Sequence, residues 1–284
     1  GVKLQYVPYR GTGPAMNDLV AGQIDLIVDQ LSNSIQQVRA GTIRAYAVVD
    51  AKRAASAPDI PTTDEAVAGI EDGSTILVGG FGLAGMPFDL IDALIRQGAK
   101  DLTIVANNAG NGDVGLAALL AAGRVRKVIC SFPRQADSYV FDKLYLAGEI
   151  ELEVVPQGNL AERMRAAGAG IGAFYCPTGV GTQLTEGKEI RTIDGRDYAL
   201  EYPIRGDYAL ISAHAGDQMG NLFYRKTARN FGPVMATAAA TTIVQVSSIV
   251  PTGDLDPEAV VTPSIYVDRV VEVEARHYTV QGAR

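Results

Sequence analysis

The chain has 284 residues, of which 47% are hydrophobic and 20% are charged, and its formal net charge is −7. This composition is typical of a soluble globular protein with one large domain or two smaller ones. The negative net charge argues against binding to nucleic acid or to an anionic membrane surface. The only two cysteines, Cys130 and Cys176, lack the spacing of a metal site, so we expect two reduced thiols and no metal.

Residues 1–63 form the first predicted unit, in which strands and helices alternate in a βαβαβ pattern. Val7–Asp25 has the pattern of a strand, a turn and a helix; Asp25–Val28, a helix near Ser34–Ala40 and Ile43–Val49 complete the unit. This segment resembles one lobe of the periplasmic solute-binding proteins of tripartite tricarboxylate transporters. Because the cleft of such a protein lies between two lobes, we expect a fused fragment with no activity of its own.

Residues 64–274 form the second predicted unit, and residues 275–284 form a polar tail. In the second unit, apolar strand-like runs alternate with helical patterns. The alternation predicts an α/β fold, an open and mostly parallel sheet with helices on both faces. An Asp-Gly turn within 190–200 predicts two short strands. The other predicted segments are Ile76–Val78, a helix at 88–97, Leu102–Ala106, a helix at 113–122, Val125–Cys130, Phe141–Ala147, Glu151–Val155, a helix at 160–167, Tyr208–Ala213 and Thr242–Val246.

A glycine-rich turn joins the strand at Ile76–Val78 to the helix at 88–97. Pro87 suits the first turn of that helix, where a missing N–H is tolerated. The backbone amides of such a turn, and the positive end of the helix, can approach an anionic or nucleotide-like ligand. We therefore predict a ligand-binding turn formed by Gly79, Gly80, Phe81, Gly82, Leu83, Ala84 and Gly85.

The spacing Gly80-x-Gly82-x-x-Gly85 also fits a dinucleotide-binding fingerprint. That fingerprint needs an acidic residue about 20 residues further on, at the end of the next strand, to bind a ribose hydroxyl. The next strand is followed by Asn107 and Asn108, and not by a carboxylate. The sequence therefore disfavours a nicotinamide-dependent oxidoreductase.

The signature Asp72-Gly-x-x-(apolar)3-Gly-Gly-Phe-x-x-x-Gly-x-Pro87, with the motifs that follow it, resembles the A-type subunit of the family I 3-oxoacid CoA-transferases. The resemblance covers about residues 65–273, and the variant at Ser131–Asp142 looks most like the 3-oxoadipate branch. An acetoacetate-specific enzyme is the alternative within the family. The later motifs are Asn107–Gly110, Cys130–Gln135, Val155–Arg163, Pro177–Thr182 and Arg225–Phe231.

The resemblance implies transfer of CoA from succinyl-CoA to a 3-oxo acid, with CoA and succinyl-CoA as substrates and no covalently bound cofactor. In this family the nucleophile is a glutamate in a Ser-Glu-Asn-Gly context of the B-type subunit. That tetrapeptide is absent here. Glu162, which has capping-box spacing from Asn159, and Glu186, in a polar loop, are poor substitutes. We therefore expect half of an enzyme, in a cytoplasmic hetero-oligomer whose partner is the B-type CoA-transferase subunit.

Three amide side chains are the predicted catalytic residues, in supporting roles. Asn107 and Asn108 follow a strand at the carboxyl edge of the sheet, where open α/β folds bind ligands, although such a pair can also cap the next loop. Gln157, at the end of the strand Glu151–Val155, resembles the family glutamine whose NH2 group stabilises oxyanion charge.

Two further segments are weaker candidates. Arg134 could bind the second carboxylate of a dicarboxylic substrate, although an exposed loop arginine is the alternative. Arg229 and Asn230 could contact CoA phosphates or another polypeptide of the assembly. Two other functional classes remain open from the sequence: a binding protein that acts through residues 1–63, and an inactive component that serves only in assembly.

Overall fold

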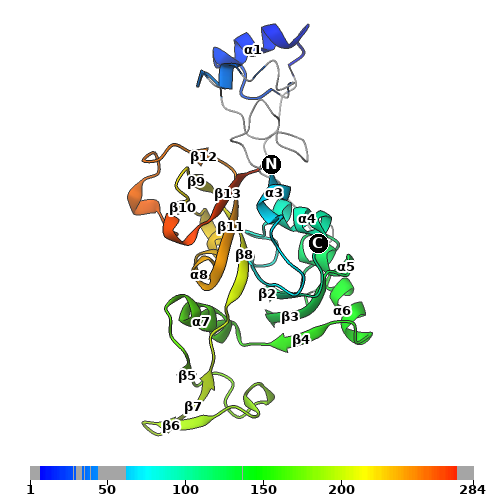
Figure 1. Cartoon of the computed structure of the whole chain (residues 1–284), viewed down its shortest axis with the longest axis vertical. Helices are drawn as coiled ribbons and strands as arrows, with labels where there is room; N and C mark the ends of the chain where they lie inside the picture. The colour runs from blue at the N-terminus through cyan, green and yellow to red at the C-terminus, as the bar shows by residue number, and fades with distance from the viewer. Residues whose placement is uncertain are drawn as a thin grey trace. The chain divides into compact units, whose positions relative to one another are not determined.

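The computed structural model describes residues 7–27, 29, 34, 36–38, 40–43, 62–135 and 137–273 (Figure 1). The chain divides into two compact units, Gly1–Thr62 and Thr63–Arg284. The tail predicted at 275–284 lies outside the described residues.

In the N-terminal unit, helix α1 spans Thr12–Val20 and buries Ala15 and Met16. The hydroxyl of Tyr9 donates to Asp18 Oδ2 over 2.7 Å, so the segment before α1 is tied to the helix. The helix predicted after the first turn is therefore present.

The strands predicted for this unit are not found where the structure describes it. Residues 7–10 and 25–27 are not in strands, whereas residues 34 and 36–38 are helical as expected. A short apolar run becomes a strand only when a neighbouring segment supplies backbone hydrogen bonds, and no sheet includes a described residue of this unit. Residues 44–49, most of the last predicted strand, lie outside the described residues.

A seven-stranded sheet forms the centre of the second unit, in the order β13-β11-β8-β1-β2-β3-β4. Every neighbouring pair in it is parallel, which confirms the predicted fold class. The chain adds β2, β3 and β4 on one side of β1 and adds β8, β11 and β13 on the other, so the strand order reverses at β1 and β8. The strands are β1 (Thr75–Val78), β2 (Leu102–Asn108), β3 (Val125–Phe132), β4 (Glu151–Val154), β8 (Gly206–Ala213), β11 (Ala239–Val246) and β13 (Arg269–Glu272).

Helices cover both faces of this sheet, because its side chains alternate between two apolar clusters. Ile76 and Val78 pack with helices α3, α4 and α5, whereas Leu77 packs with α7 and α8. A third cluster joins β3 to α6 around the buried ring of Phe141. The helices are α3 (Thr63–Val67), α4 (Phe88–Gln97), α5 (Leu116–Ala121), α6 (Tyr139–Leu146), α7 (Gln157–Gly168) and α8 (Gly232–Ala238).

Two small sheets complete the second unit (Figure 1). One has the order β10-β9-β12 and follows the carboxyl ends of β8 and β11. The other, antiparallel, has the order β5-β7-β6 and contains the predicted hairpin, with Asp194 and Gly195 at its turn. These strands are β5 (Phe174–Cys176), β6 (Ile190–Ile193), β7 (Arg196–Glu201), β9 (Ala215–Asp217), β10 (Leu222–Phe223) and β12 (Ile249–Val250).

Candidate functional site

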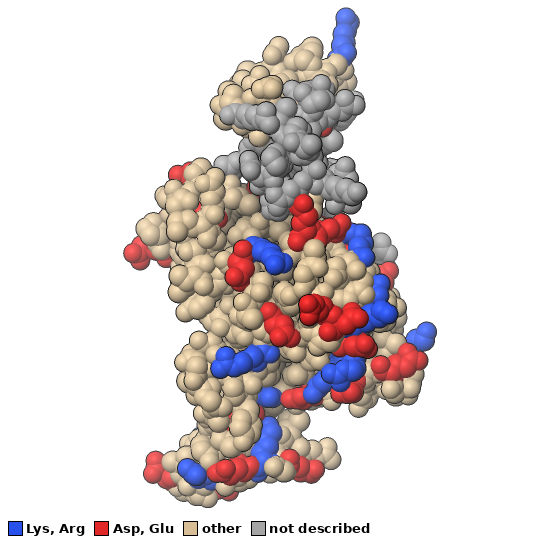
Figure 2. Space-filling view, in the orientation of Figure 1, with Lys and Arg blue, Asp and Glu red and all other residues tan. Residues whose placement is uncertain are grey.

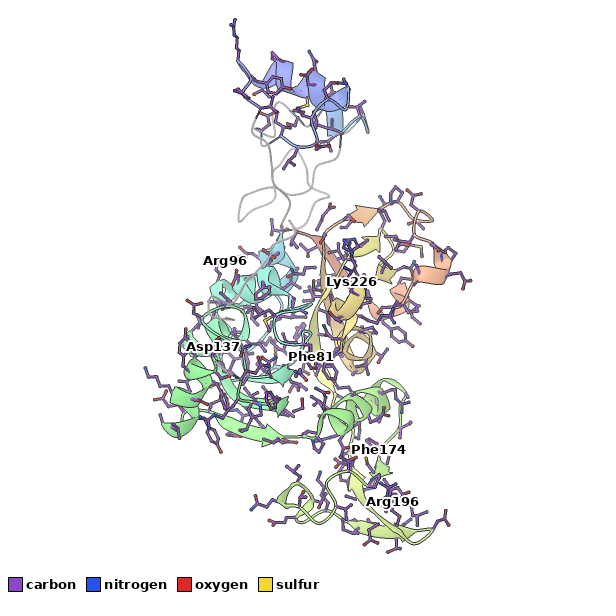
Figure 3. The ribbon with its side chains drawn as sticks, turned by 180° about the vertical axis from the view of Figure 1, so that it is seen from behind. Phe81, Arg96, Asp137, Phe174, Arg196 and Lys226 are labelled. Atoms are coloured by element: carbon purple, nitrogen blue, oxygen red, sulfur yellow. The ribbon has the colours of Figure 1, made fainter. Side chains whose placement is uncertain are left out.

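The glycine turn lies at the carboxyl end of the parallel sheet, where the strand order reverses and open α/β folds bind their ligands. Its base is fixed because Gly79 N donates to Leu210 O of β8 over 2.9 Å. Its tip is closed because Phe81 and Ala84 exchange two backbone hydrogen bonds of 3.0 and 3.1 Å. Phe81, at this tip, is 52% exposed. Figure 3 labels its position.

Three backbone N–H groups of the turn, those of Gly82, Leu83 and Gly85, have no acceptor among the described residues. At Gly82, φ is +61° and no atom lies within 4 Å of an added Cβ, so a ligand can reach the backbone there. Successive free N–H groups in a turn form a site for an anionic oxygen. The turn thus combines amides that hold its shape with amides that are available to a ligand.

The helix end beside the turn is capped by a distant side chain, which corrects the prediction that it faces a ligand. Helix α4 has Pro87 in the N-cap position and no capping side chain of its own. Gln245 of β11 accepts from the N–H groups of Asp89 and Leu90, at 3.1 Å each, and donates to Asp89 Oδ2 over 3.2 Å. These bonds satisfy the first amides of α4, so the helix end has less to offer a ligand than the turn.

Asn107 and Gln157 come together at the carboxyl edge of the sheet, 50 residues apart in sequence. Gln157 Nε2 donates to Asn107 Oδ1 over 2.7 Å, and Ser131 Oγ lies 3.1 Å from the same oxygen. Asn107 is 2% exposed, and its Nδ2 has no acceptor among the described residues. Two donors on Oδ1 therefore orient the carboxamide so that its NH2 group is left unpaired.

Sequence reasoning missed Ser131, whose hydroxyl also lies 3.1 Å from the backbone oxygen of Asn107, so that its one proton is shared between the two acceptors. Ser131 lies in the last part of β3, at the same edge as the end of β2. The rule that selected Asn107, a polar residue at the carboxyl end of a parallel strand, applies equally to Ser131.

Asn108 is next in sequence, but its side chain holds the following loop. Its Oδ1 accepts from Gly110 N over 2.8 Å, and the residue is 1% exposed. This is the loop-capping arrangement that the sequence left open as the alternative for the asparagine pair.

Gln157 is the first residue of α7 and is exposed, whereas the sequence predicted it at the end of a strand. Because α7 begins there, Asn159 lies inside the helix and its side chain bonds to Glu201 over 3.1 Å. The predicted capping box with Glu162 is therefore wrong, and Glu162 pairs instead with Arg165. Glu186 is exposed in its loop.

The two remaining candidate segments have different surroundings in the structure. Arg134 is 73% exposed and pairs with Asp142 of α6 at 2.9 Å. Arg229 is also exposed, whereas Asn230 is half-buried and bonds to the glycine turn through Gly80 N at 3.0 Å. Asn230 therefore contacts the backbone of the glycine turn.

The remaining reactive groups form no second centre in the described part of the chain. Burial raises the pKa of Cys130 to about 12, which keeps its thiol protonated. His214 packs edge-on against Phe223, and His277 lies outside the described residues. Among the described residues, no cluster of His, Cys, Asp or Glu is suited to a metal ion, and no helix has the length and apolar character needed to cross a membrane.

Charge on the surface is mixed. On the face seen in Figure 2, coloured Lys and Arg side chains lie beside Asp and Glu, without one large basic patch. A polyanionic ligand on that face would therefore depend on local donors such as free backbone amides.

A parallel α/β sheet with a glycine turn at its point of strand reversal, and with carboxamide groups at the same carboxyl edge, defines a ligand-binding protein of the open α/β class. Within this class, residues 60–273 match the family described as Coenzyme A transferase, and the chain belongs to that family. Residues 1–108 are also similar to the Tripartite tricarboxylate transporter family receptor, so this second match extends beyond the predicted boundary at residue 63.

Individual relatives cover the second unit. The chain is 70% identical over 208 residues to the A-type subunit of 3-oxoadipate CoA-transferase from Pseudomonas putida. The aligned region covers 73% of this chain and 90% of the relative. The protein of the same name from Acinetobacter baylyi is 64% identical, covering 75% of this chain and 94% of the relative. In fold, the chain is similar to glutaconate coenzyme A-transferase from Acidaminococcus fermentans, with a TM-score of 0.69 and 22% identity over 76% of this chain and 75% of that one.

Proposed function

We propose that this chain is the A-type subunit of a 3-oxoadipate CoA-transferase, which moves CoA from succinyl-CoA to 3-oxoadipate. The observation that carries the proposal is the 70% identity to a protein of that name over 90% of its length. A partner of the B type would complete the enzyme and supply the glutamate nucleophile. We also propose a cytoplasmic location, where CoA thioesters are available.

The proposed reaction proceeds through the glutamate of the B-type partner. Its carboxylate attacks the thioester carbonyl of succinyl-CoA and expels the CoA thiolate, which leaves a mixed anhydride. The thiolate then attacks the glutamyl carbonyl, which gives a glutamyl-CoA thioester and succinate. The carboxylate of 3-oxoadipate attacks this thioester, and the returning thiolate releases 3-oxoadipyl-CoA and the free glutamate.

Each attack places negative charge on a carbonyl oxygen, and this chain would supply the donors for that charge. The free N–H groups of Gly82, Leu83 and Gly85 support this role because no protein acceptor in the described structure competes for them. Gln157 keeps a second N–H beyond the one it gives to Asn107, since an amide nitrogen carries two. A donor aimed at the developing oxyanion lowers the barrier, because its bond strengthens in the transition state.

The other amide residues would orient these donors and the acid. The unpaired NH2 group of Asn107 suits a substrate carboxylate, because it donates without adding a charge. Asn108 would contribute through the loop that it holds at Gly110. We further propose that residues 1–62 take no part in catalysis, because the site residues all belong to the second unit.

Co-expression with a candidate B-type partner tests the function. The purified complex should convert succinyl-CoA and 3-oxoadipate to 3-oxoadipyl-CoA and succinate, and the chain purified alone should be inactive. A complex that uses acetoacetate in place of 3-oxoadipate would reassign the acceptor. Transfer by the isolated chain, or a covalent CoA adduct on one of its side chains, would contradict the division of labour between the two polypeptides.

A further inference from the structure

The glycine turn depends on a side chain from a distant segment. Asn230 Oδ1 accepts from Gly80 N, and Asn230 Nδ2 donates to Ala84 O, each over 3.0 Å. One carboxamide therefore spans the turn from its entry to its exit, across 150 and 146 residues of sequence. A carboxamide suits this task because it presents one acceptor and one donor side by side.

The backbone of Asn230 is held in a conformation that non-glycine residues avoid. Its φ is +27°, and Lys226 in the same segment has φ of +54°. Such conformations are energetically unfavourable and persist where the surroundings enforce them. Here the same side chain helps to enforce it, since Asn230 Oδ1 also accepts from Phe231 N over 2.7 Å and Nδ2 donates to Ala228 O over 3.0 Å.

Figure 3 labels the turn at Phe81 and this segment at Lys226, and the backbones of the two come close at Gly85 and Ala228. An added Cβ at Gly85 would lie 2.3 Å from Ala228 O and 2.6 Å from Asn230 Nδ2. Backbone atoms cannot yield at such distances, so the turn has no space to shift towards the segment. Asn230 and the missing side chain at Gly85 together define where the turn lies.

Asn230 also determines which amides of the turn are left for a ligand. It uses the N–H of Gly80, while the closed tip uses those of Phe81 and Ala84. The N–H groups of Gly82, Leu83 and Gly85 are those without an acceptor in the described structure. Without the carboxamide, Gly80 N–H would lose its acceptor, and Ala84 C=O would keep only the bond from Phe81 N–H. The turn would then lose the link that fixes its curvature.

We propose that Asn230 is a positioning residue that fixes the glycine turn so that its free amides meet the thioester group of the CoA substrate. This inference rests on the proposed function, because the thioester is the ligand that it assigns. Asn230 acts through the backbone of the turn and touches no substrate itself. The chemistry that it serves is recognition of a carbonyl oxygen that gains negative charge.

The decisive variant is Asn230→Asp, in the complex with the B-type partner. It keeps the size and the acceptor but replaces the NH2 group with an oxygen that faces the carbonyls of Ala84 and Ala228. We expect kcat/KM for succinyl-CoA to fall by about 10²-fold, the loss associated with a displacement of about 1 Å in a reacting geometry. The KM for the 3-oxo acid acceptor should change by less than about threefold, because the acceptor is bound by other groups.

Asn221→Ala provides the matched control. Asn221 is a half-buried asparagine that also holds backbone, accepting from Ser264 N over 2.9 Å and donating to Asp217 Oδ2 over 2.7 Å, but it does not contact the turn. The variant Asn221→Ala should lower the melting temperature without a selective loss of kcat/KM for succinyl-CoA. If both variants lose the same activity at equal loss of stability, Asn230 is merely structural and the proposal is wrong.

Amide hydrogen exchange in the turn gives a readout that does not depend on activity. Exchange at the bonded amides of Gly80, Phe81 and Ala84 should accelerate in Asn230→Asp and remain unchanged in Asn221→Ala. If exchange is unchanged in Asn230→Asp, Asn230 does not hold the turn. If exchange is faster but the kinetics are normal, Asn230 holds the turn without positioning it for the reaction. Either result would overturn the proposal. An inactive wild-type complex would refute the proposed function, while the exchange result would still show whether Asn230 holds the turn.

Discussion

The parallel sheet and the small antiparallel sheet β5-β7-β6 are held in different ways. All seven residues of β2 are buried, whereas all four residues of β6 are exposed. The hydrophobic clusters in the described part of the chain include residues of β1, β2, β3, β8 and β11, but none of β5, β6 or β7. Apolar packing thus fixes the sheet that carries the site, and the small sheet must rely on polar contacts.

Those polar contacts converge on Glu201, the last residue of β7, which is 2% exposed. Lys188 Nζ lies 2.7 Å from its carboxylate, and Asn159 of α7 donates to it over 3.1 Å. Arg163 of α7 donates to Tyr202 O over 2.7 Å. Helix α7 makes these polar contacts with the small sheet and makes apolar contacts with the parallel sheet. Because α7 begins at Gln157, the site lies beside both kinds of contact, one apolar and one electrostatic.

Leu77→Ala should have the largest effect, because Leu77 is fully buried in β1 between two neighbouring strands. Loss of its side chain should lower the free energy of unfolding by about 2–5 kcal/mol, measured by denaturant titration. The control is Ile193→Ala in β6, where the side chain is 39% exposed, and the expected loss is about 0.5 kcal/mol. Equal losses would show that the small sheet packs as tightly as the large one.

Gln157→Ala should act on turnover and not on stability, since Gln157 is exposed at the start of α7. We expect kcat of the complex to fall by about 10²-fold, about 2.7 kcal/mol, through loss of one oxyanion donor. Gln183→Ala is the control and should retain the wild-type rate, because Gln183 is an exposed glutamine in the short 3-10 helix Gln183–Thr185 before β6. A near-normal rate for Gln157→Ala would remove this residue from the proposed site.

Lys188→Met should destabilise the attachment of the small sheet, because it leaves the buried carboxylate of Glu201 without its nearest cation. The expected loss is about 1–3 kcal/mol in the free energy of unfolding, because a buried carboxylate loses a charged hydrogen bond and keeps only the bond from Asn159 and the more distant Arg163. Adding Glu201→Gln should recover part of this loss, as a double-mutant cycle would measure. Strictly additive losses would mean that the two residues do not interact.

The sequence predicted what depends on local periodicity. Apolar runs such as Ile76–Val78, separated by amphipathic helices, were sufficient for the parallel sheet and for both layers of helices. The helix at 88–97 coincides with α4 because its apolar spacing and the following Gly98 act locally. The sequence also placed Asn107 and Gln157, each separately, at an edge of the sheet, and the structure brings their side chains into contact.

What the sequence could not predict depends on contacts between distant residues. The cap of α4 comes from Gln245, 156 residues beyond Asp89, and the clamp on Gly80 comes from Asn230, 150 residues away. No local pattern marks a glutamine in a strand as a helix cap. The start of α7 at Gln157 was missed because Pro156, in the N-cap position, has no side chain able to cap the helix.

Glu153→Gln is the variant with the smallest expected effect. It tests the ion pair that links β4 of the parallel sheet to α7, which in turn contacts the small sheet. Glu153 lies on β4 and pairs with Lys127 at 2.7 Å and Arg163 at 3.1 Å. Burial opposes its ionisation, but hydrogen bonds from Lys127 and Arg163 outweigh burial and hold the pKa of Glu153 below its ordinary value of 4.5. A lowered pKa in the folded state means that the ionised carboxylate stabilises the fold above the unfolded pKa. This stabilisation is lost as the pH falls through the folded pKa.

The stability gap between wild type and Glu153→Gln should therefore be present at about pH 6 and close as the pH drops below about 4. Because the side chain is 35% exposed, solvent screening limits the gap to below about 1 kcal/mol, measured by denaturant titration at each pH. Glu151→Gln, which removes the more exposed pair with Arg126, should give a smaller gap and serves as the control. A gap that widens towards acid pH would mean that the fold prefers the protonated form of Glu153. Arg163 would then hold α7 in place mainly through its other contacts, with Tyr202 O at 2.7 Å and with Glu201 of β7 at 3.9 Å.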